Sequence, residues 1–227
     1  MPPLLFWSGF AALAAALLSP LHPYGTALFF AHMIEHEIMM VVAVPLMVAA
    51  RPMPVLLWGL PDRWRPQALA LGGKAGVRAG WRWATDLFSA TALHIVLLWF
   101  WHVPPLFEAA VAHESVHLAQ HLSFVVSAVL FWVAVFDRDQ RRYGQGAAIV
   151  ALFLCSMQAA LLGALLTFSP RLWFSAGPDP YDICGLTRFE DQELAGLIMW
   201  VPACSIYVFA ALWMLARWLG RMETRHA

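Results

Sequence analysis

Long runs of apolar residues alternate with short polar stretches along this chain. A helix rises 1.5 Å per residue, so about 20 apolar residues are enough to cross the ~30 Å hydrocarbon core of a bilayer. Prolines and polar clusters separate the runs, which indicates turns between helices. The runs that are long enough, or nearly so, are residues 4–19, 24–50, 84–102, 108–136, 146–168 and 191–219.

The composition agrees with a membrane protein. Of the 227 residues, 61% are hydrophobic and only 12% are charged, whereas about 25% of a soluble domain is charged. Such a chain has too little polar surface to cover a globule in water. We therefore predict an all-α integral membrane protein, with residues 1–227 forming one transmembrane helical domain. The expected fold is a bundle of about six transmembrane helices, and seven is the alternative count.

Residues 51–83 depart from this pattern, because they mix proline, tryptophan and arginine and hold no long apolar run. Tryptophan together with arginine is typical of segments at the headgroup level of a membrane. This stretch is predicted to be a cytoplasmic or interfacial loop that contains a short helix.

The basic residues give the orientation of the bundle. In the six-span arrangement, all lysines and arginines except Arg171 and Arg188 fall on one side of the membrane. The positive-inside rule makes that side cytoplasmic, so both termini are predicted to be cytoplasmic and the protein to cross the membrane several times. Acidic residues gather on the opposite, outer side, where they would attract cations.

Histidines recur at helical spacing inside two of the predicted spans. His32 and His36 are four residues apart in the second span, and His113, His117 and His121 continue that spacing in the fourth. Residues at i and i+4 share one face of a helix, and ionisable groups inside spans are costly and usually functional. We predict a metal or haem site built from some of these five histidines. The first and last of the fourth-span histidines lie about 12 Å apart along the axis, so three stacked rings cannot bind one ion.

Other residues could complete or support the site. Ligating histidines usually donate their second nitrogen to a carboxylate or carbonyl group, and thioether sulfur favours copper(I). Imidazole alone suits zinc, copper and iron equally, so the nearby methionines make copper the favoured metal. The further ligands or supporting residues are His94, His102, Met33, Met40, Met157, Glu35, Glu114 and Asp191.

Two other functions compete with this interpretation. HESVH, residues 113–117, matches the H-E-x-x-H pattern of zinc proteases, with Glu114 as the base, and HMIEH, residues 32–36, matches its inverse. A b-type cytochrome would need two histidines on facing helices around a haem, for which His36 with His121 or His94 would serve. Zinc and haem therefore remain alternatives to copper. Cys155, Cys184 and Cys204 form no C-x-x-C motif and indicate no disulfide framework.

Three stretches resemble the polytopic CtaG family of cytochrome c oxidase assembly factors. They are LHPYGTALFFAHMIEHEIMMVVAVPLMVAARP, HVPPLFEAAVAHESVHLAQHLSFVVSAVLFW and LTRFEDQELAGLIMW. The resemblance extends over residues 22–218. Its most specific parts are the paired histidines of the second span, the His-Val-Pro-Pro turn, the spaced histidines of the fourth span, and Asp191, Gln192, Gly196 and Trp200.

The resemblance implies a non-enzymatic factor needed to make a haem–copper oxidase active, by handling copper as a chaperone. The expected partners are cytochrome c oxidase subunits, other copper chaperones and membrane lipid, but no nucleic acid. On that basis the candidate copper ligands are His32, His36, His113, His117 and His121.

Overall fold

The structure is a computed structural model that describes residues 2–137, 143–175 and 178–226. Within these residues the chain is helical and contains no strand. The elements in chain order are α1 (Pro2–Leu18), α2 (Leu21–Gly25), α3 (Phe29–Glu37), the π-helix η1 (Ile38–Ala43), α4 (Val44–Ala49), α5 (Met53–Gly59), α6 (Arg65–Gly73), α7 (Ala75–Ala84), α8 (Leu87–Trp101), α9 (Pro104–Ala112), α10 (Glu114–Phe136), α11 (Gly144–Thr167), α12 (Pro180–Cys184) and α13 (Arg188–His226).

The helices are long and apolar enough for a membrane protein, as predicted. In the described part of the chain, four helices could cross a bilayer: Phe29–Ala49, Glu114–Phe136, Gly144–Thr167 and Arg188–Arg221. A fifth span results if α7 and α8, which meet at an angle of 63°, are taken together. Helix α1 is apolar but has only 17 residues.

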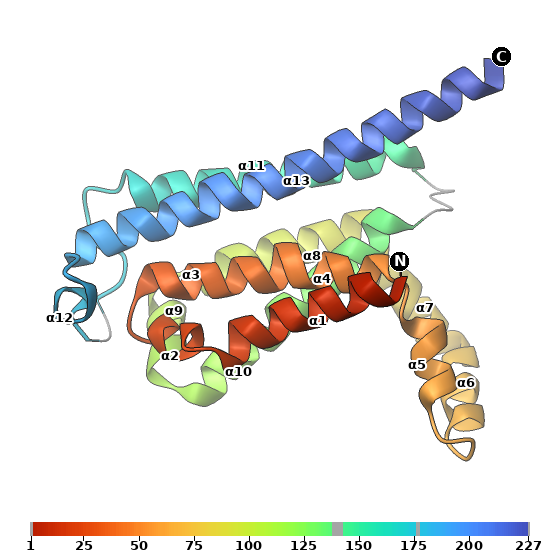
Figure 1. Cartoon of the computed structure of the whole chain (residues 1–227), viewed down its shortest axis with the longest axis horizontal. Coiled ribbons are helices and arrows are strands. Elements are labelled where there is room, and N and C mark those ends of the chain that lie inside the picture. The colour runs from red at the N-terminus through yellow and green to blue at the C-terminus, as the bar shows by residue number, and fades with distance from the viewer. Residues whose placement is uncertain (1, 138–142, 176–177, 227) are drawn as a thin grey trace.

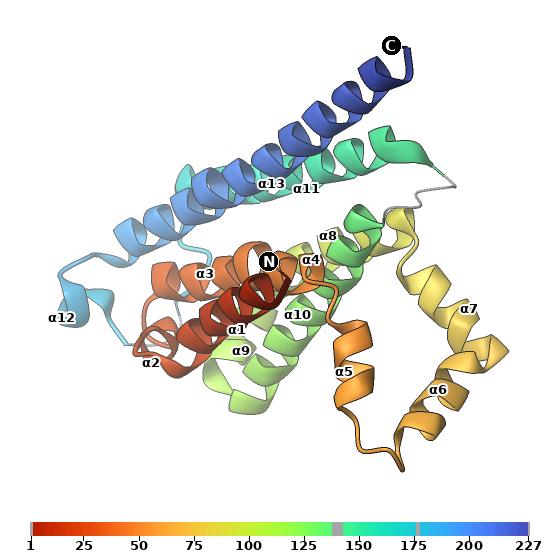
Figure 2. The ribbon, with the colours of Figure 1, turned by 45° about the vertical axis from the view of Figure 1, so that its right-hand side comes forward.

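The structure corrects three of the predicted segments. The run 24–50 begins in α2, and its candidate span begins only at Phe29 and continues through α3, η1 and α4. The run 108–136 is interrupted at His113, whose extended backbone (φ −131°, ψ 116°) separates α9 from α10. Residues 51–83 form three short helices instead of one, and these project from one end of the bundle (Figures 1 and 2).

Pro45 explains the π-helix that follows the histidine-bearing α3. Proline lacks an N–H group, so a helix that contains it must leave a carbonyl without its partner. The N–H of Val44 bonds to the carbonyl of Met39, five residues back. In the same register the carbonyl of Met40 would face Pro45, which has no N–H to donate to it. The indole N–H of Trp132 on α10 donates to that carbonyl at 3.0 Å. The irregular helix is therefore fastened to α10.

Helices α11 and α13 form a closely packed pair that lies side by side in both views (Figures 1 and 2). A Cβ atom on Gly163 would lie only 2.6 Å from the carbonyl oxygen of Gly196, and the reverse distance is the same. Only glycine permits this approach, which is the small-residue packing typical of membrane helices. Helix α13 also packs on α3 and so joins the pair to the rest of the bundle.

The two ends of the bundle differ in character (Figure 1). The histidine end holds α2, α9, α12 and the first turns of α3 and α10. The arginine-rich end holds α5, α6 and α7, together with the last turns of α4, α10 and α13. Helix α1 begins and α13 ends at the arginine-rich end, so the two ends of the described chain lie on the same side.

Candidate metal centre

A cluster of histidine rings lies at the histidine end, where α2, α3 and α10 meet. The ring of His32 on α3 lies 4.3 Å from His36 and 5.1 Å from His117 of α10, measured between centroids. His121 lies 5.1 Å from His36 and 4.2 Å from His117. The i, i+4 spacing on each helix therefore brings together four of the five histidines predicted as ligands.

Three of these rings place nitrogen atoms close to one another. One nitrogen from each of His32, His36 and His121 lies within 4.8 Å of the other two, and all three residues are buried. We call these residues the inner triad. Two nitrogens bound to the same ion at about 2 Å lie up to about 4 Å apart, so small ring rotations would complete the set.

Several buried ring nitrogens of this cluster lack hydrogen-bond partners. Neither nitrogen of His36 is bonded, and Nε2 is unbonded in His32, His117 and His121. Buried polar groups are nearly always paired, because each unpaired one costs about 1–3 kcal/mol. A metal ion bound by neutral imidazole nitrogens would remove this cost, so the residues fit such an ion.

The main chain before α3 orients the His32 ring. His32 Nδ1 lies 3.0 Å from the carbonyl oxygen of Gly25, so the tautomer that donates there leaves Nε2 as the ligand atom. Gly25 is closely surrounded, since a Cβ atom there would lie 2.9 Å from Oε2 of Glu35. The glycine thus lets the turn after α2 approach α3 closely enough to hold the ring.

His22 is a member of the cluster that the sequence analysis missed. Its Nδ1 lies 2.7 Å from Oε1 of Glu35, and its ring stacks on His117 at 5.4 Å. One ligand atom each from His22, Glu35 and His121 also lies within 4.8 Å of the others. We call these three residues the outer group. His22 belongs to the short helix α2, so no i, i+4 spacing pointed to it; the only signal was a histidine between two prolines beside a span.

His113 and Glu114 lie outside the cluster. Both are exposed, and His113 precedes the first turn of α10 in an extended conformation. The prediction that three histidines stack on one helix is therefore wrong. The same break prevents HESVH from placing His113 and His117 on one helical face, as the H-E-x-x-H motif requires.

The two histidines of the α8 segment have different surroundings. His102, at the C-terminal end of α8, is buried near the cluster. Its Nδ1 bonds to the carbonyl of Leu98, and its Nε2 has no partner. His94 instead belongs to a separate hydrogen-bond network deeper in the bundle. Only His102 is therefore placed to support the cluster.

The three methionines considered as ligands or supporting residues have different surroundings. Met33 and Met40 are buried in two separate apolar clusters. Met157 is half exposed on α11. The involvement of these methionines in metal binding therefore stays a prediction.

Asp191 has a positioning role in the structure. Its two carboxylate oxygens accept the backbone N–H groups of Phe29 at 2.9 Å and Phe30 at 2.8 Å. These are orphan donors in the first turn of α3, whose own N-cap residue, Leu28, offers no side-chain bond. A carboxylate at a helix N-terminus is favourable, so α13 fixes the start of the histidine-bearing helix. The neighbouring Gln192 accepts the N–H of Trp173 and so holds the loop after α11.

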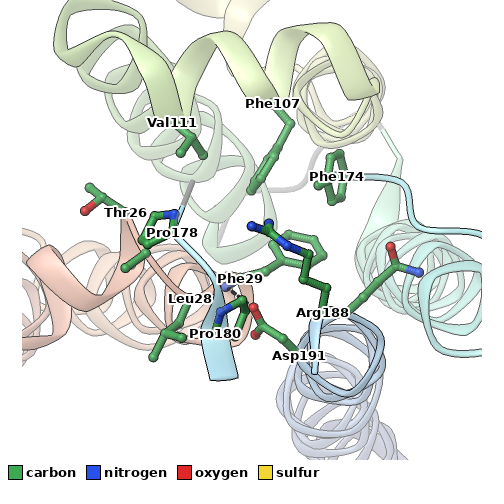
Figure 3. A pocket seen from close by; sticks show the side chains of 13 residues that line it. Thr26, Leu28, Phe29, Phe107, Val111, Phe174, Pro178, Pro180, Arg188 and Asp191 are labelled. Atoms are coloured by element: carbon green, nitrogen blue, oxygen red, sulfur yellow. Dashed lines mark hydrogen bonds between the residues drawn. The ribbon is translucent and has the colours of Figure 1, made fainter. Parts of the chain in front are cut away.

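Aromatic side chains cover the inner triad on its α9 side. Phe107 lies 5.1 Å from the His32 ring, and it packs against Phe29 at 4.9 Å and Phe174 at 4.1 Å. Figure 3 shows these rings around a small cavity of about 30 Å³, with Arg188 and Asp191 at its side. A cavity of this size holds one or two waters. His22, with 39% of its side chain exposed, is the member of the cluster most open to the surroundings.

Comparison with known proteins supports the resemblance seen in the sequence. The family model described as cytochrome c oxidase caa3 assembly factor (Caa3_CtaG) matches residues 2–221. The searches of curated proteins and of solved structures found no match. The matched region includes every histidine of the cluster and the Asp191 anchor. The chain therefore belongs to the Caa3_CtaG family of cytochrome c oxidase assembly factors.

Proposed function

We propose that this protein supports the assembly of a caa3-type cytochrome c oxidase by binding a copper ion at the inner triad and passing it to an oxidase subunit. One observation carries the proposal: the buried nitrogens of His32, His36 and His121 converge and have unsatisfied bonding capacity. Family membership supplies the client, an oxidase. A haem–copper oxidase needs copper, which makes copper a cargo suited to three imidazole ligands.

The two overlapping groups suggest a two-step route for the ion. The outer group contains the partly exposed His22 and the carboxylate of Glu35, which would attract and first hold a cation. His121 belongs to both groups, so rotation of its ring could carry the ion to the buried inner triad. His22 and Glu35 are thus the capture residues in this proposal, and His32 and His36 retain the ion.

For the membrane arrangement, we infer six spans formed by α1, α3 to α4, α8, α10, α11 and α13. The arginine-rich end would be cytoplasmic by the positive-inside rule, with both termini there, in a bacterial plasma membrane. The histidine cluster would then face the outer half of the membrane. Copper would arrive from the outer side, either as the free ion or on another copper chaperone.

The geometry favours an ion over the alternatives. A bis-histidine haem needs two rings held apart on opposite faces of a macrocycle. The rings here pack directly against each other, with centroids 4.2–5.1 Å apart for the closest pairs between His32, His36, His117 and His121. A protease needs a glutamate facing a metal-bound water, whereas Glu114 is exposed and Glu35 is bonded to His22.

The test is copper binding by the purified full-length protein in detergent, measured by competition with a chromophoric copper(I) chelator. We expect His36→Ala to weaken binding at least about 100-fold, since it removes one of three ligands from a buried site. His113→Ala is the matched control and should bind within about threefold of the wild type. Equal affinity of the His36 variant and the wild type would refute the inner triad as the copper site.

A further inference from the structure

A second, larger cavity lies at the arginine-rich end, between the α11–α13 pair and the rest of the bundle. Its volume is about 690 Å³, which falls in the range of ligand-binding pockets. We call it the arginine cleft. Its walls come from η1 and α4 on one side, α10 at the base and α13 on the other. Its apolar lining includes Trp132, Phe136, Phe209, Ala210, Trp213 and Leu46.

The cleft combines an apolar interior with a cationic end. Aromatic and aliphatic side chains line most of its length, and none of the histidines lines it. Among the described residues that line the cleft, Arg51, Arg217 and Arg221 are cationic and Asp137 is acidic. The described lining therefore has a positive formal charge, although the whole chain is neutral. A ligand that matches both features is an amphiphile with an anionic head.

The dimensions match one leaflet of a bilayer. The cleft follows α13 from Ile206 to Arg221, a length of about 22 Å at 1.5 Å per residue. Half of a bilayer, including its headgroup region, is also about 20–22 Å thick. With Arg217 and Arg221 at headgroup level, the apolar part of the cleft extends to the middle of the membrane.

Two of the arginines are held in defined positions by the fold. Arg51 has a φ of 53°, in the left-handed region that a non-glycine residue rarely adopts. Such conformations persist where tertiary structure requires them, and they gather at ligand-binding positions. The Arg217 guanidinium lies 4.6 Å from the ring centre of Trp213, which restricts its rotation. Arg51 and Arg217, from separate segments, both line the cleft, and the guanidinium group is the preferred partner of a phosphate.

We propose that the arginine cleft binds one anionic phospholipid. The phosphate lies at Arg51 and Arg217, with Arg221 beside it, and an acyl chain lies along α4, α10 and α13 against Trp132 and Phe209. The charged end selects this occupant over a transmembrane helix of another protein, whose surface within the membrane is apolar. The site is separate from the histidine cluster and does not depend on copper binding.

Native mass spectrometry of the delipidated full-length protein tests this proposal. The probes are phosphatidylglycerol, which is anionic, and phosphatidylcholine, which is zwitterionic, each added at equal concentration. We expect the wild type to retain one phosphatidylglycerol, bound about tenfold more tightly than phosphatidylcholine. The double substitution Arg51→Gln and Arg217→Gln should abolish this preference. The matched control is Arg78→Gln with Arg82→Gln, on the exposed face of α7, which should keep it.

A second variant covers the case in which loss of the arginines impairs folding. Ala210→Trp fills the cleft and leaves every arginine in place, so it should expel the lipid while copper binding at the inner triad stays unchanged. An unaltered lipid preference in the Arg51/Arg217 variant, or an equal loss in the α7 control, would overturn the proposal. Retention of lipid by Ala210→Trp, or a protein subunit held there in place of lipid, would also overturn it.

Discussion

His36 and His94 are both buried in the same bundle, yet their surroundings are opposite. His94 has a partner at each nitrogen, the Ser127 hydroxyl and the Tyr207 hydroxyl, both at 3.1 Å, and its ring stacks on Phe131. His36 has no partner at either nitrogen. A histidine whose capacity is used within the protein serves structure. One that is buried with its capacity unused is the better candidate for a ligand, so burial alone does not distinguish the two roles.

Substitutions of His36 and His94 should differ most in how much copper stabilises the folded protein. A ligand that binds only the folded state stabilises it by about 4 kcal/mol when its free concentration is a thousand times its Kd. We expect copper(I) at that excess to raise the unfolding free energy of wild type and of His94→Leu by similar amounts. His36→Leu should lose nearly all of this stabilisation. Denaturant unfolding with and without copper measures it, and equal stabilisation of the two variants would contradict the comparison.

Without copper, we expect the His94 variant to be destabilised more than the His36 variant. His94→Leu leaves the Tyr207 hydroxyl buried without its partner and should lower the unfolding free energy by about 2 kcal/mol. His36→Leu removes two unsatisfied nitrogens from a buried site, so its effect should lie between zero and a gain of about 1 kcal/mol. Unfolding of the metal-free proteins in the same detergent measures both. A larger loss in the His36 variant would show that its nitrogens are bonded in solution.

The hydrophobic pattern predicted the helical membrane fold well, because apolar length is a property of each segment by itself. The same holds for the pairs His32–His36 and His117–His121, where helical spacing is sufficient to place two rings on one face. The spacing also suggested that His113 continues the second pair. The break before Glu114 depends on how α9 packs, so the local pattern did not reveal it.

Residues that act across long sequence separations could not be assigned from the sequence. Asp191 was predicted as a ligand or a supporting residue of the site, and in the structure it caps α3, more than 150 residues earlier in the chain. His22 joins the cluster because α2 folds back against α3 and α10. The spacing of residues in the sequence does not predict this packing. The distinction between His36 and His94 is of the same kind, since it depends on which hydroxyl groups neighbouring helices bring to each ring.

His22 shares features with both His94 and His36, and its substitution has the smallest expected effect. Its Nδ1 is bonded to Glu35, while the residue is partly exposed and shares His121 with the inner triad. If it captures copper without retaining it, His22→Ala should slow copper loading about tenfold, as loss of steering groups does, and change the final affinity less than threefold. Stopped-flow loading and equilibrium competition separate the two quantities, with His113→Ala as the control. A large loss of affinity at an unchanged loading rate would instead make His22 a retaining ligand, and the sequence of capture followed by transfer would have to be abandoned.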